Sequence, residues 1–254
     1  MTTPAVRERP IIFSAPMIRA ILDGRKTQTR RAVKRPSGGL STVAKFCVKG
    51  TAYPDLYAWV DGHPDDIETW GVVGEPMRCP YGEPGDRLWV RETWSPDHAA
   101  FYPHFPVVYR ADGTVSDWQI EKGTVESPEA GGERFPFRWR SPIHMPRWAS
   151  RITLEITGVR VERLNDISTN DAYAEGVRIG DKCSNSWECE SDSSFGIGSF
   201  RDDLSKAAGG RPWKECWCLV PAYRALWESI HGEGSWARNE WVWAIEFKRV
   251  EDKP

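Results

Sequence analysis

The feature that most constrains this fold is a two-residue period of large apolar side chains in two distant segments. In the first, Ile152, Leu154 and Ile156 alternate with Arg151, Thr153, Glu155 and Thr157. In the second, Trp241, Trp243, Ile245 and Phe247 alternate with Val242, Ala244, Glu246 and Lys248. A period of two places successive side chains on opposite faces of a β-strand. We therefore expect two half-buried strands that belong to a sheet.

Start and stop signals predict two amphipathic helices. Ser14 reads as an N-cap and Pro16 as a first-turn proline, and Gly24 ends the segment. A longer helix opens at Pro221 and stops at Gly232. Its apolar stripe consists of Tyr223, Leu226, Trp227 and Ile230. Because these residues recur at helical spacing, we expect all four to pack into the core.

A third, shorter helix is expected over 170–175, since Ser168 and Asp171 resemble a capping box and Gly176 follows. Glu175 then lies at the helix C-terminus. A glutamate at this place could take part in proton transfer. The alternative is that it is simply an exposed side chain in the last turn.

A further strand is expected over 88–94, after the turn signal at Pro84 and Gly85. Alternation places Glu92 on its apolar side, with Arg91 facing the other way. A buried carboxylate needs a partner, and we expect the basic run described below to supply it. The remaining segments, 32–84, 96–145 and 178–220, read as loop-rich insertions. The chain as a whole predicts an α+β fold with mainly antiparallel pairing, curled into a small β-barrel with short flanking helices.

Composition narrows the classes of partner. The chain has 254 residues and a formal net charge of -2, which argues against a protein that coats long duplexes. Its 14 tryptophans are expected mostly in cores, with a few available to stack on a base. The segment Met1–Pro10 lacks an apolar signal-peptide region, and no run reaches membrane-spanning length. We expect a cytoplasmic protein with no membrane partner and a small or short ligand.

Basic and hydroxyl side chains are most concentrated between Gly24 and Arg31, a run that contains Arg25, Lys26, Thr27, Thr29 and Arg30. Six cations and no acid fall within residues 25–35. Such a cluster attracts anions, and repulsion by arginines lowers the pKa of a lysine among them, so that its neutral amine becomes available. The alternative is a solvated basic turn.

Four of the six cysteines lie in or beside the third insertion: Cys183, Cys189, Cys216 and Cys218. Four thiols could bind a structural zinc ion, although their spacings depart from the usual pattern. Free reduced thiols are the alternative that we favour, and no cofactor is otherwise expected.

The order of three segments, 24–30, 85–92 and 171–176, resembles the ASCH domain family. The opening near Arg9–Phe13 and the closing segment Ser235–Trp243 resemble the long phage and prophage branch of that family. The resemblance covers roughly residues 9–31, 85–95, 146–176 and 223–250, and the three insertions lie outside it. It implies a single domain over 1–254 with a PUA-like β-barrel, a fold that handles RNA and modified nucleobases. A phage-encoded member would act in the cytoplasm of its bacterial host.

Small bacterial members of this family include an amidohydrolase that removes the acetyl group from acetylated cytidine. By motif position, its lysine, threonine and glutamate look like Lys26, Thr29 and Glu175. The substrate-binding residues that the resemblance implies are Arg25, Thr27, Arg30, Arg31, Arg91 and Glu92. In an ideal strand Lys26 and Thr29 would point to opposite faces, so this chemistry requires irregular backbone just after Gly24. The expected ligand is a nucleoside, a nucleotide or a short single-stranded nucleic acid. The alternative is a module that binds RNA, DNA or a modified base without catalysis, and the oligomeric state stays open.

Overall fold

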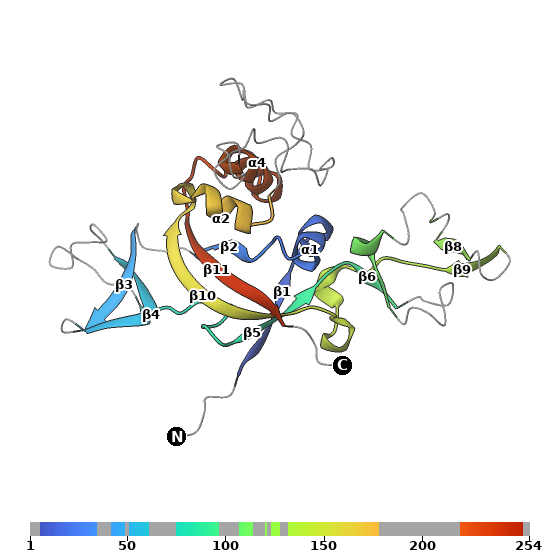
Figure 1. Ribbon diagram of the computed structural model, residues 1–254, viewed down its shortest axis with the longest axis horizontal. Coiled ribbons are helices and arrows are strands. Elements are labelled where there is room, and N and C mark those ends of the chain that lie inside the picture. The colour runs from blue at the N-terminus through green and yellow to red at the C-terminus, as the bar shows by residue number, and fades with distance from the viewer. Residues whose placement is uncertain are drawn as a thin grey trace. The chain divides into compact units, whose positions relative to one another are not determined.

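The computed structural model describes residues 6–34, 42–48, 51–60, 75–96, 107–113, 120, 123–127, 132–177 and 219–250. Its elements form a mixed α+β fold in which sheet predominates (Figure 1). The chain divides into two compact units. Unit 1 comprises Met1–Gly24, Gly85–Glu155 and Lys248–Pro254, and unit 2 comprises Arg25–Pro84 and Ile156–Phe247. A single domain over the whole chain stays a prediction.

The main sheet has five strands in the order β1-β5-β10-β11-β2. Its strands are β1 (Glu8–Ile12), β5 (Arg87–Arg91), β10 (Thr153–Arg163), β11 (Trp241–Val250) and β2 (Gln28–Ala32). β1 runs parallel to β5, whereas β5 with β10 and β11 with β2 are antiparallel pairs. Among the described strands no pairing joins β1 to β2, so no closed barrel is detected.

Unit 1 also contains α1 (Ala15–Leu22), which begins after Ser14 and ends before Gly24, as the sequence predicts. Gly24 has a φ of 73°, the left-handed conformation that glycine adopts most readily. The strand expected over 88–94 is shorter than predicted. It consists of β5, an interruption, and the two-residue β6 (Trp94–Ser95).

The remaining elements of unit 1 are small. They are β7 (Val108–Tyr109), η2 (Arg110–Asp112), β8 (Thr124–Ser127), β9 (Glu133–Pro136), η4 (Pro142–His144) and η5 (Arg147–Ala149). Short β-ladders pair β6 with β7 and β8 with β9. The described part of this insertion is therefore loop-rich, as expected.

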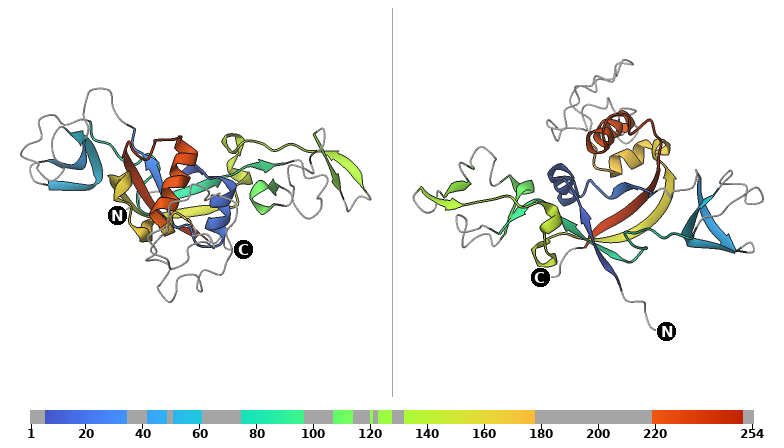
Figure 2. Two further views of the ribbon diagram at one scale, coloured as in Figure 1. Left: turned by 90° about the horizontal axis from the view of Figure 1, so that it is seen from above. Right: turned by 180° about the vertical axis from the view of Figure 1, so that it is seen from behind.

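Unit 2 holds two of the described helices, which pack against each other and against Val242 of β11. They are α2 (Thr169–Ala174) and α4 (Leu219–His231), and η6 (Leu164–Asp166) precedes α2. Figures 1 and 2 both show α2 and α4 side by side. Between them lies a core cluster that includes Leu164, Ala172, Trp227 and Val242. Burial of a large apolar side chain stabilises a fold by about 1.5–3 kcal/mol, so this cluster fixes α2 against the sheet.

Two expectations about this core are corrected. Ile230 is 53% exposed, and the buried side of α4 is formed by Leu219, Tyr223 and Trp227, four residues apart. β11, which was expected to be half-buried, is buried on both faces from Val242 to Ile245, and Val242 on its second face packs in the cluster that includes residues of α2 and α4.

The segment 32–84 was expected to be irregular, with short strands at most. Instead β3 (Thr42–Val48) and β4 (Thr51–Val60) form an antiparallel hairpin with a register shift between Lys45 and Cys47. That shift breaks the alternation on which strand prediction depends.

Candidate functional site

Lys26 lies in a short irregular segment between Gly24 and β2. The main chain of Thr27 donates a hydrogen bond to Ala174 O at 2.9 Å and accepts one from Phe247 N at 2.8 Å. The segment is therefore fixed between the end of α2 and β11. This is the irregular backbone after Gly24 that the sequence argument required.

The Lys26 ammonium meets the C-terminal end of α2. Its Nζ donates to Glu175 Oε2 at 2.8 Å, to Glu175 O at 2.9 Å and to Gln28 O at 2.8 Å. These three acceptors match the three hydrogens of an ammonium group. The side chains of Lys26 and Glu175 are 0% and 3% exposed. Residues distant in sequence thus form a buried ion pair.

Arg30 binds the second oxygen of the same carboxylate. Its Nη1 donates to Glu175 Oε1 at 3.1 Å, and its Nε donates to Glu162 Oε1 at 2.9 Å. The guanidinium also lies 5.8 Å from the centre of the Tyr223 ring. Arg30 therefore orients Glu175 from the side opposite Lys26.

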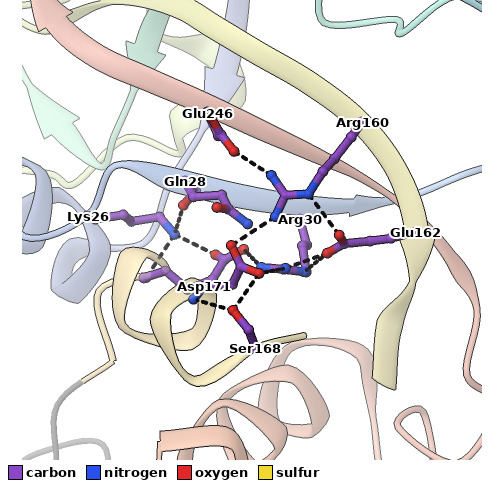
Figure 3. A network of polar contacts seen from close by, with 9 residues as sticks. Lys26, Gln28, Arg30, Arg160, Glu162, Ser168, Asp171 and Glu246 are labelled. Carbon is purple, nitrogen blue, oxygen red and sulfur yellow. Dashed lines mark hydrogen bonds and ion pairs between the residues drawn. The ribbon is translucent and has the colours of Figure 1, made fainter. Parts of the chain in front are cut away.

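A second layer of charges surrounds this core (Figure 3). Arg160 contacts Glu162 at 2.8 Å, Asp171 at 2.8 Å and Glu246. Asp171 Oδ2 also accepts from Ser168 Oγ at 2.8 Å. Ser168 is the N-cap of α2, as the capping box predicts, so the same serine begins the helix and braces the network.

Gln28 fills the space between the two layers. In the orientation that satisfies its amide, it donates to Asp171 Oδ1 at 3.0 Å and accepts from Arg30 Nη1 at 2.7 Å. The side chains of Lys26, Arg30, Glu175 and Gln28 thus all have hydrogen-bond partners within the network. The network is therefore preorganised.

Burial changes the proton affinities of these groups. Burial lowers the pKa of Lys26, the Glu175 carboxylate acts in the opposite direction, and the charges of Arg31 and Arg30 lower it further. The sequence argument expected this direction but attributed it to arginine repulsion alone. For Asp171, burial acts to raise the pKa, but the hydrogen bond from Ser168 and the charge of Arg160 outweigh it. Asp171 thus holds its charge, whereas the Lys26 ammonium gives up its proton more readily than a surface lysine.

Several predicted site residues meet in this network. Lys26, Arg30 and Glu175 form its centre, and Arg25 Nη1 donates to Gly176 O at 3.3 Å. The backbone of Thr27 ties the segment to α2, while its side chain is exposed.

Thr29 lies on β2 between Gln28 and Arg30, opposite Ile245 on β11. Because alternate strand residues point to opposite faces, its side chain is directed away from the face that carries Gln28 and Arg30. Within the part of the chain that the structure describes, no hydrogen bond joins Thr29 to Lys26 or Glu175.

Arg31 shares the second face of β2 with Thr29. Its guanidinium lies 6.0 Å from the centre of the Tyr81 ring, and it is opposite Trp243 in the β-ladder. Trp243 lines a hollow together with Tyr57, Cys79, Gly82, Glu83, Pro84 and Val159. That hollow has room for about one water molecule, so it does not fit a nucleobase.

Arg91 and Glu92 belong to unit 1 and have partners there. The Arg91 guanidinium lies 4.5 Å from the centre of the Trp89 ring. Glu92 is buried, and Arg151 donates to both of its oxygens at 2.9 and 3.0 Å. The partner of Glu92 is therefore Arg151, which corrects the expectation that the basic run would supply it. Burial raises the pKa of Glu92, and Arg151 acts against that rise.

The metal prediction concerns Cys183, Cys189, Cys216 and Cys218, which lie outside the described residues. Elsewhere in the described ranges, no group of three or more His, Cys, Asp and Glu side chains has the arrangement of a metal site. None of the helices that the structure describes has the length and apolar character needed to cross a membrane.

Sequence reasoning did not assign six residues of the network to the site: Gln28, Arg160, Glu162 and Glu246, together with Ser168 and Asp171, which it predicted only as a capping box. The alternation of side chains along the strands could have identified most of them. Gln28 and Arg30 share one face of β2, and Arg160 and Glu162 share one face of β10. Same-face charges of opposite sign on two strands of one sheet indicate a polar cluster.

No family model, curated protein or solved structure matches this chain. The resemblance to the ASCH domain stays a prediction from sequence, and function is argued from the site.

Proposed function

We propose that this protein is a nucleobase-directed amidohydrolase that removes an acyl group, such as acetyl, from the exocyclic amine of a cytosine nucleoside or nucleotide. The PUA-like ASCH architecture is part of the same proposal, supported by the mixed α+β fold and the order of the three motif segments. The observation that carries the proposal is the 2.8 Å contact between Lys26 Nζ and Glu175 Oε2 in a buried site. An amine and a carboxylate this close can exchange a proton.

The reaction needs two events. An oxygen nucleophile bonds to the acyl carbon, and the bond from that carbon to the exocyclic nitrogen breaks as the nitrogen receives a proton. Glu175 accepts the proton that the nucleophile loses, and the Lys26 ammonium donates one to the departing amine. Burial lowers the pKa of Lys26, which favours this donation. When the nucleophile is water, the acid is released and proton transfer from Glu175 to Lys26 restores the starting state; when it is Thr29, a water molecule must first hydrolyse the acyl-threonine ester that has formed.

Arg30 acts in this scheme as a positioning residue. Its guanidinium is engaged by Glu162 and Glu175, so it fixes the Glu175 carboxylate and does not reach toward a substrate. The nucleophilic oxygen comes from Thr29 or from water, and Thr29→Val separates the two sources. Loss of turnover in that variant assigns the oxygen to Thr29, whereas retention assigns it to water.

A second candidate is recognition of a modified base without turnover. It is favoured by the three acceptors that already occupy the Lys26 ammonium and by the complete burial of that side chain. Catalysis requires the side chains around Lys26 to move apart so that a substrate can reach it. A site that stays closed would serve structure alone.

The test is release of cytidine from N4-acetylcytidine, followed by chromatography. We expect turnover by the wild type and at least a hundredfold loss in Lys26→Met and in Glu175→Gln, on the scale of a removed acid–base group (roughly 10²–10⁴). Arg224→Ala is a matched control, because this arginine is exposed on α4 and its ion pair with Glu228, 3.6 Å long, lies at the surface. Circular dichroism checks that each variant is folded. A wild type that is inert on acylated nucleosides, yet is stabilised against heat by a modified base, would favour the second candidate.

A further inference from the structure

Amide cleavage needs a hydrogen-bond donor that the network around Lys26 does not supply. As the nucleophile bonds to the acyl carbon, negative charge collects on the acyl oxygen, and a donor placed at that oxygen lowers the barrier. The Lys26 ammonium already has three acceptors, and Arg30 is engaged by two carboxylates. The main-chain N–H groups of Thr27, Glu175 and Gly176 are bonded as well. The donor must therefore come from another side chain.

Tyr223 brings a hydroxyl group to this part of unit 2. It lies on α4, which packs beside α2 (Figures 1 and 2). The residue is 3% exposed, and the rings of Trp227 and Trp236 lie 6.3 and 6.1 Å from its own, centre to centre. The guanidinium of Arg30, which binds Glu175, lies 5.8 Å from the centre of the Tyr223 ring. The ring is thus fixed beside the arginine that holds the carboxylate.

The hydroxyl of Tyr223 is a donor without an acceptor. Unit 1 offers a comparison, because the Tyr109 ring centre lies 3.9 Å from the guanidinium of Arg151, which binds the buried Glu92. In that case the hydroxyl donates to Ala149 O at 2.9 Å. The Tyr223 hydroxyl makes no hydrogen bond with any residue that the structure describes. An enclosed hydroxyl without a partner is unfavourable, so a ligand oxygen that accepts its hydrogen bond is stabilised there.

The surroundings keep this hydroxyl protonated. Burial raises the pKa of Tyr223 well above its usual value, and the charge of Glu175 raises it further, while Arg30 acts in the opposite direction. Because the effect of a charge falls off with distance, the Glu175 carboxylate lies near the hydroxyl. Tyr223 is therefore a neutral donor close to the proton-transfer pair.

We propose that Tyr223 donates a hydrogen bond from its hydroxyl to the acyl oxygen of the substrate and stabilises the negative charge that forms there. This inference rests on the proposed amidohydrolase function. As the nucleophile's oxygen bonds to the acyl carbon, its proton passes to Glu175, and one electron pair of the C=O bond moves onto the acyl oxygen. That pair re-forms the double bond as the bond to the exocyclic nitrogen breaks and Lys26 gives that nitrogen a proton.

The order of charges in this step is favourable. Tyr223 keeps its own proton throughout. Glu175 is neutral while the acyl oxygen is negative, so two negative charges are never present together beside the hydroxyl.

The experiment compares Tyr223→Phe with the wild type in the release of cytidine from N4-acetylcytidine. Phenylalanine keeps the ring beside Arg30 and removes only the hydroxyl group. We expect kcat to fall about a hundredfold while KM changes less than about threefold, as for loss of one donor to an oxyanion (roughly 10²–10³). A ring that serves only to hold Arg30 would leave both constants unchanged.

Tyr109→Phe is the matched control, because it removes the hydroxyl of a tyrosine that also lies beside an arginine, but in unit 1. Its kcat should equal that of the wild type. In thermal unfolding, Tyr109→Phe should melt below the wild type because it loses the hydrogen bond to Ala149 O. Tyr223→Phe should melt at the same temperature as the wild type or above it.

Three outcomes would overturn the inference. If the wild type is active and Tyr223→Phe keeps its kcat, the inference fails and the proposed function stands. If Tyr223→Phe melts well below the wild type, the hydroxyl is already bonded in the free protein. A wild type that is inert on N4-acetylcytidine and other acylated nucleosides overturns the inference together with the proposed function.

Discussion

The buried pair of Lys26 and Glu175 predicts an asymmetric response to mutation. Glu175→Leu removes the carboxylate that lies 2.8 Å from the enclosed Lys26 ammonium, leaves it the carbonyl oxygens of Gln28 and residue 175, and removes one partner of Arg30. Loss of one member of a buried ion pair costs about 3–5 kcal/mol, so we expect that range of destabilisation. Lys26→Met leaves Glu175 paired with Arg30 at 3.1 Å, so we expect a smaller cost of about 1–3 kcal/mol.

The double variant Lys26→Met/Glu175→Leu should be more stable than Glu175→Leu alone. It removes both charges and replaces them with apolar groups of similar size, while Arg30 keeps its contact with Glu162. Exchange of a buried pair for apolar side chains is often neutral. We therefore expect the two substitutions to be coupled by at least about 2 kcal/mol.

The assay is urea unfolding at pH 7, followed by tryptophan fluorescence and far-ultraviolet circular dichroism. The matched control is the exposed pair Arg224 and Glu228 on α4, 3.6 Å apart, for which the coupling of the two alanine substitutions should stay below about 0.5 kcal/mol. The reasoning fails if Glu175→Leu costs less than about 1 kcal/mol, or if the costs of the two single variants add up to that of the double variant.

Three further predictions concern the elements around the site. Ser168→Ala should lower the free energy of unfolding by about 1 kcal/mol, because the serine hydroxyl caps α2, whereas Ser229→Ala should change it by less than about 0.5 kcal/mol; urea titration distinguishes them. Gly24→Ala should cost about 1 kcal/mol, because φ is 73° although no atom lies within 4 Å of an added Cβ, and an equal melting temperature would contradict this. Burial raises the pKa of Glu92 above its ordinary value of 4.5, so folding favours the protonated carboxyl group. The resulting contribution to the free energy of unfolding is present below pH 4.5 and is lost as pH rises through the pKa of the folded state. The stability of the wild type relative to Glu92→Gln should therefore fall with rising pH, and a rise would refute the argument.

Local signals predicted much of the secondary structure. The first-turn proline of α1, the capping box of α2 and the alternation of β10 each act within a few residues, whereas the Ser14 side chain at the start of α1 makes no capping hydrogen bond. Such signals depend on backbone sterics and on hydrogen bonds between near neighbours, so they can be read directly. The hairpin of β3 and β4 was missed because its pattern is interrupted by the register shift.

Within the candidate site, the sequence identified Lys26, Arg30 and Glu175, but not how they are joined. Thr29 shows the difference most clearly. It stands three residues from Lys26 and belongs to the same motif, yet β2 begins between them, and alternation directs its side chain away from Gln28 and Arg30. Glu92 shows it again, because the carboxylate is buried as expected but its partner is Arg151, which lies just before β10 and outside the basic run.

The amino-acid sequence by itself determined where the helices and most strands of the main sheet lie and where positive charge is concentrated. Only the tertiary structure decided that Lys26 and Glu175, separated by 149 positions, lie 2.8 Å apart and out of contact with water. The physical reason is that ion pairing and desolvation depend on distance in space and on surrounding atoms. Those atoms come from α2, β2 and β10 together, and no short stretch of sequence specifies how these elements meet.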